Sequence, residues 1–328
     1  MLTRQFASST RTASSVLAEA AASPCPESIG TGFALLDTSL EGGIRAQDLT
    51  VVAGRPGVGK TIAALQWAVH IARSGRLARF VCYEHTEEQL VGRVLVAELG
   101  SLASIENRGR VQQLQRFARE VVLGRRPVDA FVECDPIARM AFERFASYAD
   151  RLSLVRASGM HTGLPELEEF VADQGHRGAT VFVDYLQKIA CPIAGTETDR
   201  VIRLAEGLKE LALAHDVALV ALASCDAPGL TARRTRLSDI RGSVGVAYEA
   251  DVAVILNEKA TAVSKVHLAF DAVRARDFRS QIVFSIEKNR GGPAPIDLEF
   301  TKDFASYRFD PNGNFVADQL VDDVLYTD

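Results

Sequence analysis

Short apolar runs alternate with longer amphipathic segments along most of the chain. The runs at 49–53, 180–184 and 218–223 are almost continuously apolar, which is typical of strands that are buried on both faces. One helical face of the segment 198–215 is apolar throughout and consists of Val201, Leu204, Leu208 and Leu211. The pattern predicts an α/β fold with a mainly parallel, twisted sheet and helices on both of its faces.

Helical and extended segments continue to alternate from residue 31 onward. We expect further helices at 62–72, 87–99 and 164–174, and the polar stretch 103–150 also has a helical pattern. Further strands are predicted at 78–83, 152–155 and 252–256. The end of the chain has a more antiparallel character, with strands predicted at 265–270, 281–287, 296–300 and 306–309.

Residues 54–61, GRPGVGKT, form a complete G-x-x-x-x-G-K-[ST] phosphate loop between a predicted strand and a predicted helix. Its glycines let the backbone N–H groups converge on a phosphate, and the positive end of the helix adds to the attraction. Lys60 should reach the β- and γ-phosphates of ATP, and the Thr61 hydroxyl should bind Mg²⁺. An ordinary glycine turn is the alternative. The predicted nucleotide-binding residues of the loop are Gly54, Arg55, Pro56, Gly57, Val58, Gly59, Lys60 and Thr61.

Two carboxylates stand at the ends of predicted strands. Asp184 closes the strand 180–184 and is the predicted metal-binding and cofactor-binding carboxylate, with a helix cap as the alternative. Glu84 follows another strand and is placed to polarise the attacking water. Its alternative role is to cap the next helix, but Thr86 already serves that purpose. Since ligands bind at the carboxyl ends of such strands, both acids should lie near the phosphate loop.

Composition sets limits on the other functions of the chain. It has 328 residues, of which 47% are hydrophobic and 24% charged, as in an ordinary globular protein. The net charge of −5 argues against binding nucleic acid through the whole surface, but it leaves room for a local basic loop. The apolar runs are too short to span a membrane. The scattered cysteines, without a C-x-x-C pair, indicate free thiols in a reducing cytoplasm.

Three parts of the chain are distinguished by composition: an arm at 1–27, a central domain at 28–310 and an acidic tail at 311–328. The arm is rich in Ser, Ala and Thr and has no acidic residue before Glu19. A disordered arm and a transit peptide both have such a composition. The interpretation that we favour is a short helix at 11–22 that docks on a neighbouring subunit.

Several motifs, in order along residues 29–310, resemble the C-terminal ATPase domain of DnaB-type replicative helicases, a branch of the RecA-like fold. The opening segment resembles that family up to and including the phosphate loop, and EHTEEQLVGRVL is similar to the segment with the catalytic glutamate. VFVDYLQ is close to the metal-binding strand, and LSDIRGSVGVAYEADVAVIL resembles the stretch after the DNA-facing loop. IEKNRGGP resembles the segment that reaches the ATP site of the neighbouring subunit.

The resemblance implies residue roles and an assembly. By that match Glu84 and Lys60 are catalytic, Arg290 is the arginine finger and Lys288 is its companion. The family forms a homo-oligomeric ring, commonly of six subunits, with ATP between subunits. A finger far from its own phosphate loop is most useful in a neighbouring subunit, where it stabilises charge on the γ-phosphate. A solvated turn before Gly291 is the alternative for the two basic residues.

A run of arginines suggests contact with single-stranded DNA. In a ring, the loop 231–241 of each subunit would line the channel and neutralise phosphates without reading sequence. A solvated loop is the alternative, and the run contains no aromatic residue for base stacking. The candidate nucleic-acid-binding residues are Arg233, Arg234, Arg236 and Arg241.

The chain also departs from the family pattern. Ser224 stands where the family usually has a glutamine that couples the γ-phosphate to the DNA loop, and the family's separate N-terminal domain is not seen. Two functions therefore compete. The favoured one is an ATP-hydrolysing motor, a helicase or translocase, on single-stranded DNA. The alternative is a RecA-like ATPase that does not unwind DNA and acts as a regulatory or assembly switch.

Overall fold

The computed structural model describes residues 11–22, 28–172, 178–192, 195–263 and 277–321. Their order along the chain follows the predicted alternation of strands and helices. The strands are β1 (Leu49–Gly54), β2 (Ala78–Cys82), β3 (Leu152–Arg156), β4 (Thr180–Asp184), β5 (Ala218–Ser224), β6 (Val252–Glu258), β7 (Gln281–Asn289), β8 (Ile296–Asp303), β9 (Arg308–Phe309) and β10 (Asn314–Phe315). The main helices are α2 (Ala13–Ala22), α3 (Ala34–Ser39), α4 (Lys60–Arg73), α5 (Glu87–Ser101), α6 (Arg108–Val122), α7 (Val128–Cys134), α8 (Pro136–Ala146), α9 (Leu164–Ala172), α10 (Glu197–His215), α11 (Ala227–Thr231), α12 (Ser243–Glu249) and α13 (Lys259–Ala262).

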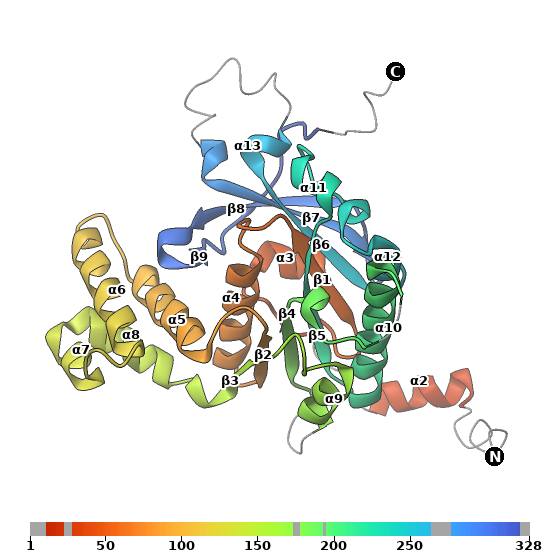
Figure 1. The fold of residues 1–328 in the computed structure, drawn as a ribbon, viewed down its shortest axis with the longest axis horizontal. Helices are drawn as coiled ribbons and strands as arrows, with labels where there is room; N and C mark the ends of the chain where they lie inside the picture. The colour runs from red at the N-terminus through yellow and green to blue at the C-terminus, as the bar shows by residue number, and fades with distance from the viewer. Residues whose placement is uncertain (1–10, 23–27, 173–177, 193–194, 264–276, 322–328) are drawn as a thin grey trace.

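The strands of the described residues form one sheet in the order β10-β8-β7-β6-β1-β5-β4-β2-β3, with β9 paired to β8 (Figure 1). The strands from β3 to β6 in this order are parallel, and β7, β8 and β10 are antiparallel. The prediction of a mainly parallel sheet with an antiparallel end is therefore confirmed. The strand predicted at 265–270 lies outside the described residues.

The parallel strands other than the edge strand β3 are buried on both faces because helices cover each side of the sheet. Along β1, Val52 belongs to a core cluster with Trp67 of α4, whereas its neighbour Val51 belongs to a second cluster with Leu208 of α10. This is the alternation expected of successive strand residues. Figure 1 shows α4 and α10 on opposite sides of the sheet. The continuous apolar runs in the sequence follow from this double coverage.

The polar stretch 103–150 folds into the three helices α6, α7 and α8 to one side of the sheet (Figure 1). Its predicted helical character is therefore confirmed. Helices α6 and α8 pack against α5, and α7 packs against α6 and α8. A third core cluster joins these helices and includes Leu99 of α5, Leu114 of α6 and Phe131 of α7. The cluster explains why such a polar sequence folds, because each helix needs to bury only one narrow face.

The structure also describes one segment on each side of the predicted central domain. The segment 311–321 packs on the domain and is not a free tail: β10 pairs with β8, and the Val321 N–H donates to the Ala262 carbonyl at 2.7 Å. Buried Lys259 also pairs with Asp318 at 2.8 Å. At the other end, α2 projects beyond α10 in Figure 1, with Leu17 exposed. No helix of the described residues is long and apolar enough to cross a bilayer.

Candidate nucleotide-binding site

The phosphate loop turns from the end of β1 into the first residue of α4, at the carboxyl edge of the parallel strands. All eight predicted residues, 54–61, lie in this turn. Gly57 and Gly59 have φ values of 81° and 103°, in the left-handed region that favours glycine. A Cβ at Gly59 would lie 2.7 Å from the ring of Phe304, so a larger residue has neither the conformation nor the space. The turn leaves the N-terminus of α4 facing a cavity of about 270 Å³.

Lys60, Thr61 and Asp184 meet at this cavity, as predicted. The Lys60 Nζ donates to the carbonyl oxygens of Gly54 and Arg55 at 2.8 and 2.9 Å. The Thr61 hydroxyl donates to Asp184 Oδ2 at 2.8 Å. Burial lowers the pKa of Lys60, against the opposing effect of the Asp184 carboxylate. Burial likewise raises the pKa of Asp184, which the Thr61 hydrogen bond counteracts.

The Thr61 hydroxyl and the Asp184 carboxylate suit a Mg²⁺ ion that is also bound by substrate phosphates, and not a metal ion bound by protein ligands alone. A hydroxyl and a buried carboxylate in direct contact are the hard oxygen ligands that Mg²⁺ takes, with the substrate phosphates completing the coordination. Among the described residues, no cluster of three or more His, Cys, Asp or Glu side chains could hold a metal ion by itself. Thr61 and Asp184 would therefore hold an ion that arrives with a triphosphate, and that ion would neutralise charge on the phosphate oxygens.

Two further side chains reach the same cavity from the neighbouring strand and helix. Glu84 follows β2, is exposed and lines the cavity, in agreement with its predicted position. Arg93 of α5 also lines it, with its guanidinium 5.3 Å from the centre of the Tyr307 ring. Arg93 was not predicted. The sequence signal was an arginine two turns beyond the Thr86 cap, on the helix that begins at the phosphate edge.

The predicted finger residues lie at the opposite edge of the sheet. Asn289 of β7 pairs with Val252 at the start of β6, whereas Gly54 pairs with Leu256 near the end of the same strand. Four residues of strand separate the two levels, which corresponds to roughly 13 Å along the sheet. Lys288 and Arg290 are therefore not brought to the phosphate loop of their own chain.

Both finger residues are held by contacts at that second edge. The Arg290 Nη1 lies 3.0 Å from Asp251 Oδ1, and the Arg290 side chain is 50% exposed. The Lys288 Nζ donates to the carbonyls of Ala247 and Tyr248 at 2.6 and 3.2 Å. Burial lowers the pKa of Lys288, and the Arg290 charge adds to that effect. Arg290 is thus positioned by its own subunit and half-open to solvent.

Asp251 is a buried residue at this second edge, and three donors from different segments bond to its carboxylate. Its carboxylate accepts hydrogen bonds from the Leu49 N–H at 2.8 Å and from Lys209 Nζ at 2.6 Å, besides the bond from Arg290. The beginning of β1, the middle of α10 and the end of β7 therefore share one carboxylate. Asp251 was not predicted as a site residue, although it lies in the family-like stretch 237–256, directly before an apolar strand.

The segment of residues 225–241, which we call the arginine segment, departs from the prediction. Arg234 is 5% exposed and lies 2.6 Å from Asp297, so the prediction that it faces a channel is wrong. Arg236 pairs with Glu287 at 3.1 Å. Arg233 donates to the Val263 carbonyl, and Arg241 pairs with Glu197 at 3.0 Å while its side chain stays 41% exposed. Two of the four arginines thus serve the fold through ion pairs with β7 and β8.

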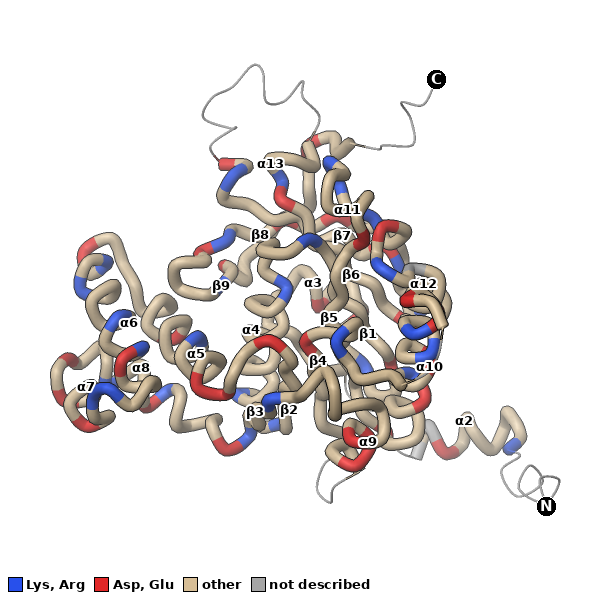
Figure 2. Tube along the Cα trace, in the orientation of Figure 1, with Lys and Arg blue, Asp and Glu red and all other residues tan. Residues whose placement is uncertain are grey.

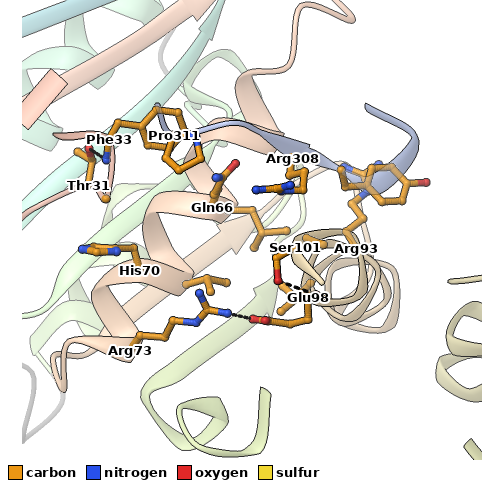
Figure 3. A pocket seen from close by; sticks show the side chains of 16 residues that line it. Thr31, Phe33, Gln66, His70, Arg73, Arg93, Glu98, Ser101, Arg308 and Pro311 are labelled. Carbon is orange, nitrogen blue, oxygen red and sulfur yellow. Dashed lines mark hydrogen bonds and ion pairs between the residues drawn. The ribbon is translucent and has the colours of Figure 1, made fainter. Parts of the chain in front are cut away.

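A second cavity, of about 170 Å³, lies along α4 towards its C-terminal end and faces α5 (Figure 3). Arg73 pairs there with Glu98, and the Tyr148 hydroxyl donates to Glu98 at 2.5 Å. Arg93 lines both cavities, but none of the predicted site residues lines this one. Lys60, Thr61 and Asp184, the residues predicted to bind phosphate and metal, line the first cavity and not this one.

A glycine turn that presents Lys60 and Thr61 to a strand-end carboxylate, at the carboxyl edge of a parallel sheet, defines a phosphate-loop nucleotide-binding domain. The family profile of the DnaB-like helicase C-terminal domain matches residues 28–141 and 159–309. The chain belongs to this family.

Relatives and solved structures agree with this assignment. The chain is 26% identical to the replicative DNA helicase DnaB of Treponema pallidum, over 85% of this chain and 55% of that protein. The corresponding values for DnaB of Geobacillus stearothermophilus are 26%, 85% and 56%. The chain thus spans about half the length of these curated relatives. A solved DnaB-like replicative helicase has the same RecA-like fold, with a TM-score of 0.67 at 18% identity over 90% of this chain and 65% of that one.

Proposed function

We propose that this chain is an ATP-hydrolysing motor that acts on single-stranded DNA, as a helicase or translocase, with ATP bound between the subunits of a ring. Its relatives are named replicative DNA helicases. The observation that carries the proposal is the placement of the phosphate loop and of Arg290 at opposite edges of one sheet. A second copy is needed to bring the two together.

The chemistry of the proposed site follows from its residues. The amides of the phosphate loop and Lys60 bind the β- and γ-phosphates, and Thr61 with Asp184 holds Mg²⁺. Glu84, exposed at the cavity, orients and polarises the attacking water. The half-exposed Arg290 of the adjoining subunit stabilises charge on the γ-phosphate during transfer, with Lys288 beside it.

Contact with DNA is proposed through the exposed part of the arginine segment. Arg241 keeps the larger exposure, whereas Arg234 is committed to the fold. Figure 2 shows basic and acidic positions mixed over the described chain, so DNA would be bound by local contacts within the channel of a ring. We further propose a hexamer with α2 docked on a neighbouring subunit, because Leu17 of this helix is exposed. Such a motor would work in the cytoplasm and would be loaded onto DNA by a partner protein.

The test is the ATPase rate of the purified chain with and without single-stranded DNA. A motor should be stimulated by DNA, and its DNA affinity should fall steeply with salt because phosphate contacts release counterions. Unwinding of a forked duplex would then separate a helicase from a translocase. A DNA-independent ATPase without salt-sensitive DNA binding would contradict the motor and support the alternative, a switch that does not unwind DNA.

A pair of matched variants tests the DNA contact itself. Arg241→Gln should weaken binding of an oligothymidylate and lower the slope of log affinity against log salt by about 0.7, the value for one phosphate contact to a single strand. Arg203→Gln is the control, because Arg203 is also an exposed arginine in an ion pair. Equal effects of the two substitutions would show that Arg241 has no specific contact with DNA.

A further inference from the structure

The two ends of the arginine segment are fastened together at the rim of the phosphate cavity. Cys225 and Ile240 form an isolated antiparallel bridge, and the Asp226 N–H donates to the Asp239 carbonyl at 2.9 Å. The Arg241 N–H donates to the carbonyl of Ser224, a residue that lines the cavity, at 3.1 Å. The arginine segment is therefore a loop whose two ends are hydrogen-bonded to each other. We call these paired ends, residues 224–226 and 239–241, the base of the segment, and a movement of the base moves both ends together.

A side chain just beyond β4, Gln187, contacts both ends of the arginine segment. Gln187 lies in the short 3₁₀ turn Leu186–Lys188, three residues beyond Asp184. Its Oε1 accepts the Ser224 N–H at 3.2 Å, while its Nε2 donates to the carbonyls of Ser224 at 3.3 Å and Arg241 at 3.2 Å. The carboxamide thus continues the β4–β5 ladder beyond its last backbone pair and contacts both ends of the arginine segment.

These contacts connect the metal carboxylate to the proposed DNA-binding residues through a short path. Asp184 and Ser224 line the same cavity from adjacent strands, and Gln187 ties the end of one strand to the end of the other. The side chain of Ser224 itself is too short to connect the end of β4 with Arg241. The three hydrogen bonds of a carboxamide, which both donates and accepts, fix a single orientation of the base relative to β4.

We propose that Gln187 is a positioning residue that transmits the state of the phosphate cavity to the arginine segment. Binding of Mg²⁺ and a triphosphate at Asp184 resets the end of β4, and Gln187 carries that change to Ser224 and Arg241 together. The inference deepens the proposed function and rests on it for the meaning of the signal, but the transmission itself is measurable without DNA.

Hydrogen exchange of the amides of the arginine segment tests the transmission. It is measured with and without Mg²⁺ and the non-hydrolysable analogue AMP-PNP, at concentrations that saturate each variant. In the unaltered chain the analogue should change the exchange rates by at least about fivefold, the lower end of typical coupling between sites. Lys60→Ala, which cannot bind the analogue, supplies the baseline.

Two substitutions at Gln187 should remove this response. Gln187→Glu keeps the acceptor for the Ser224 N–H but turns the donor towards two carbonyl oxygens into a second acceptor. Gln187→Ala removes all three bonds and serves as a second variant should the glutamate prevent folding. In both, the analogue should bind but change exchange in the arginine segment by less than about twofold. Gln112→Ala, an exposed glutamine of α6, should behave like the unaltered chain.

The outcomes separate this inference from the proposed function. A response of the arginine segment that persists in both Gln187 variants overturns the inference, and so does the lack of any response in the unaltered chain. Loss of the response in these variants alone supports it, even if the ATPase proves insensitive to DNA and the motor is contradicted. If DNA does stimulate the unaltered chain, the variants should lose at least about fivefold of that stimulation.

Discussion

The two edges of the central sheet carry complementary halves of one proposed ATP site, and they are built in different ways. At the carboxyl edge, Thr61 and Asp184 already touch, and the phosphate loop holds Lys60 through its own carbonyls. At the other edge, Arg290 is tied to buried Asp251 while half of its side chain faces solvent. The side chains proposed to bind the phosphates and Mg²⁺ already meet at the first edge, whereas Arg290 at the second edge would serve an ATP site on another chain.

Under the proposed function, this difference between the edges makes catalysis depend on assembly. Strand β6 fixes the distance between the two edges, because it pairs with β1 on one side and with β7 on the other. No side-chain rotation closes a gap of roughly 13 Å along a strand. If Arg290 is a finger, as proposed, it can act only in trans, and hydrolysis would report whether a neighbour is in place.

Arg290→Ala should have the largest effect of the substitutions considered for the second edge. We expect the ATPase turnover to fall by about 10³- to 10⁵-fold, the range known for arginine fingers, while nucleotide binding at the distant phosphate loop is retained. Steady-state ATPase assays with a parallel measurement of nucleotide affinity would check this. Arg203→Ala, another exposed and ion-paired arginine, should leave the rate unchanged.

Mixed assemblies of two variants would sharpen the result, because the intact phosphate loop and the intact Arg290 would then be on different chains. Arg290→Ala keeps its phosphate loop, and Lys60→Ala, expected to abolish nucleotide binding, keeps its finger. If they are co-expressed in equal amounts, about a quarter of the interfaces (one half times one half) should combine both intact halves. Recovery of activity to about that fraction supports a finger in trans. A mixture as inactive as its components would mean that Arg290 does not serve a neighbour.

Glu84→Gln should have the next largest effect, and it acts at the first edge. The neutral amide removes the carboxylate that polarises water, so hydrolysis should fall by about 10²- to 10⁴-fold with nucleotide affinity preserved. Single-turnover hydrolysis after saturation with ATP measures the chemical step. Glu88→Gln, on an exposed glutamate in the first turn of α5, is the matched control. A comparable loss in both variants would assign the effect to the helix start instead of to the chemistry.

The first edge could be predicted from the sequence because its parts are local. The phosphate loop and the aspartate at the end of β4 each follow a continuous apolar strand, and parallel strands place their ends at one edge. The Thr86 cap and the bounds of α5 followed from the same local rules, as the observed capping box shows.

The rest depended on pairings between distant segments that periodicity does not encode. Arg234 could not be distinguished from Arg241 in the sequence, because its partner Asp297 lies on β8 and is reached only once the sheet has formed. Asp251 and Gln187 lie within stretches that resemble the family, but their roles could not be derived from the sequence, since these roles depend on backbone groups and side chains that other strands bring to them. The docking of residues 311–321 likewise requires the edge of β8 to exist first.

Asp251→Asn should have the smallest effect on the rate and tests whether the second edge is pre-positioned. Three donors converge on the two carboxylate oxygens, and an asparagine would offer one acceptor and an additional donor. We expect the free energy of unfolding to fall by about 2–3 kcal/mol, below the full cost of breaking a buried pair because Arg290 is half exposed. Turnover should fall by about tenfold, since the guanidinium remains but loses its orientation.

Urea unfolding and ATPase assays on the same preparation would separate the two consequences for Asp251→Asn. Asp48→Asn is the matched control, because Asp48 lies 4.0 Å from Lys209 and is not bonded to Arg290 in the structure described. It should cost at most about 1 kcal/mol and leave turnover intact. If Asp251→Asn destabilised the fold without slowing hydrolysis, Asp251 would support the sheet without positioning the finger, and the second edge would be shaped only when a neighbour binds.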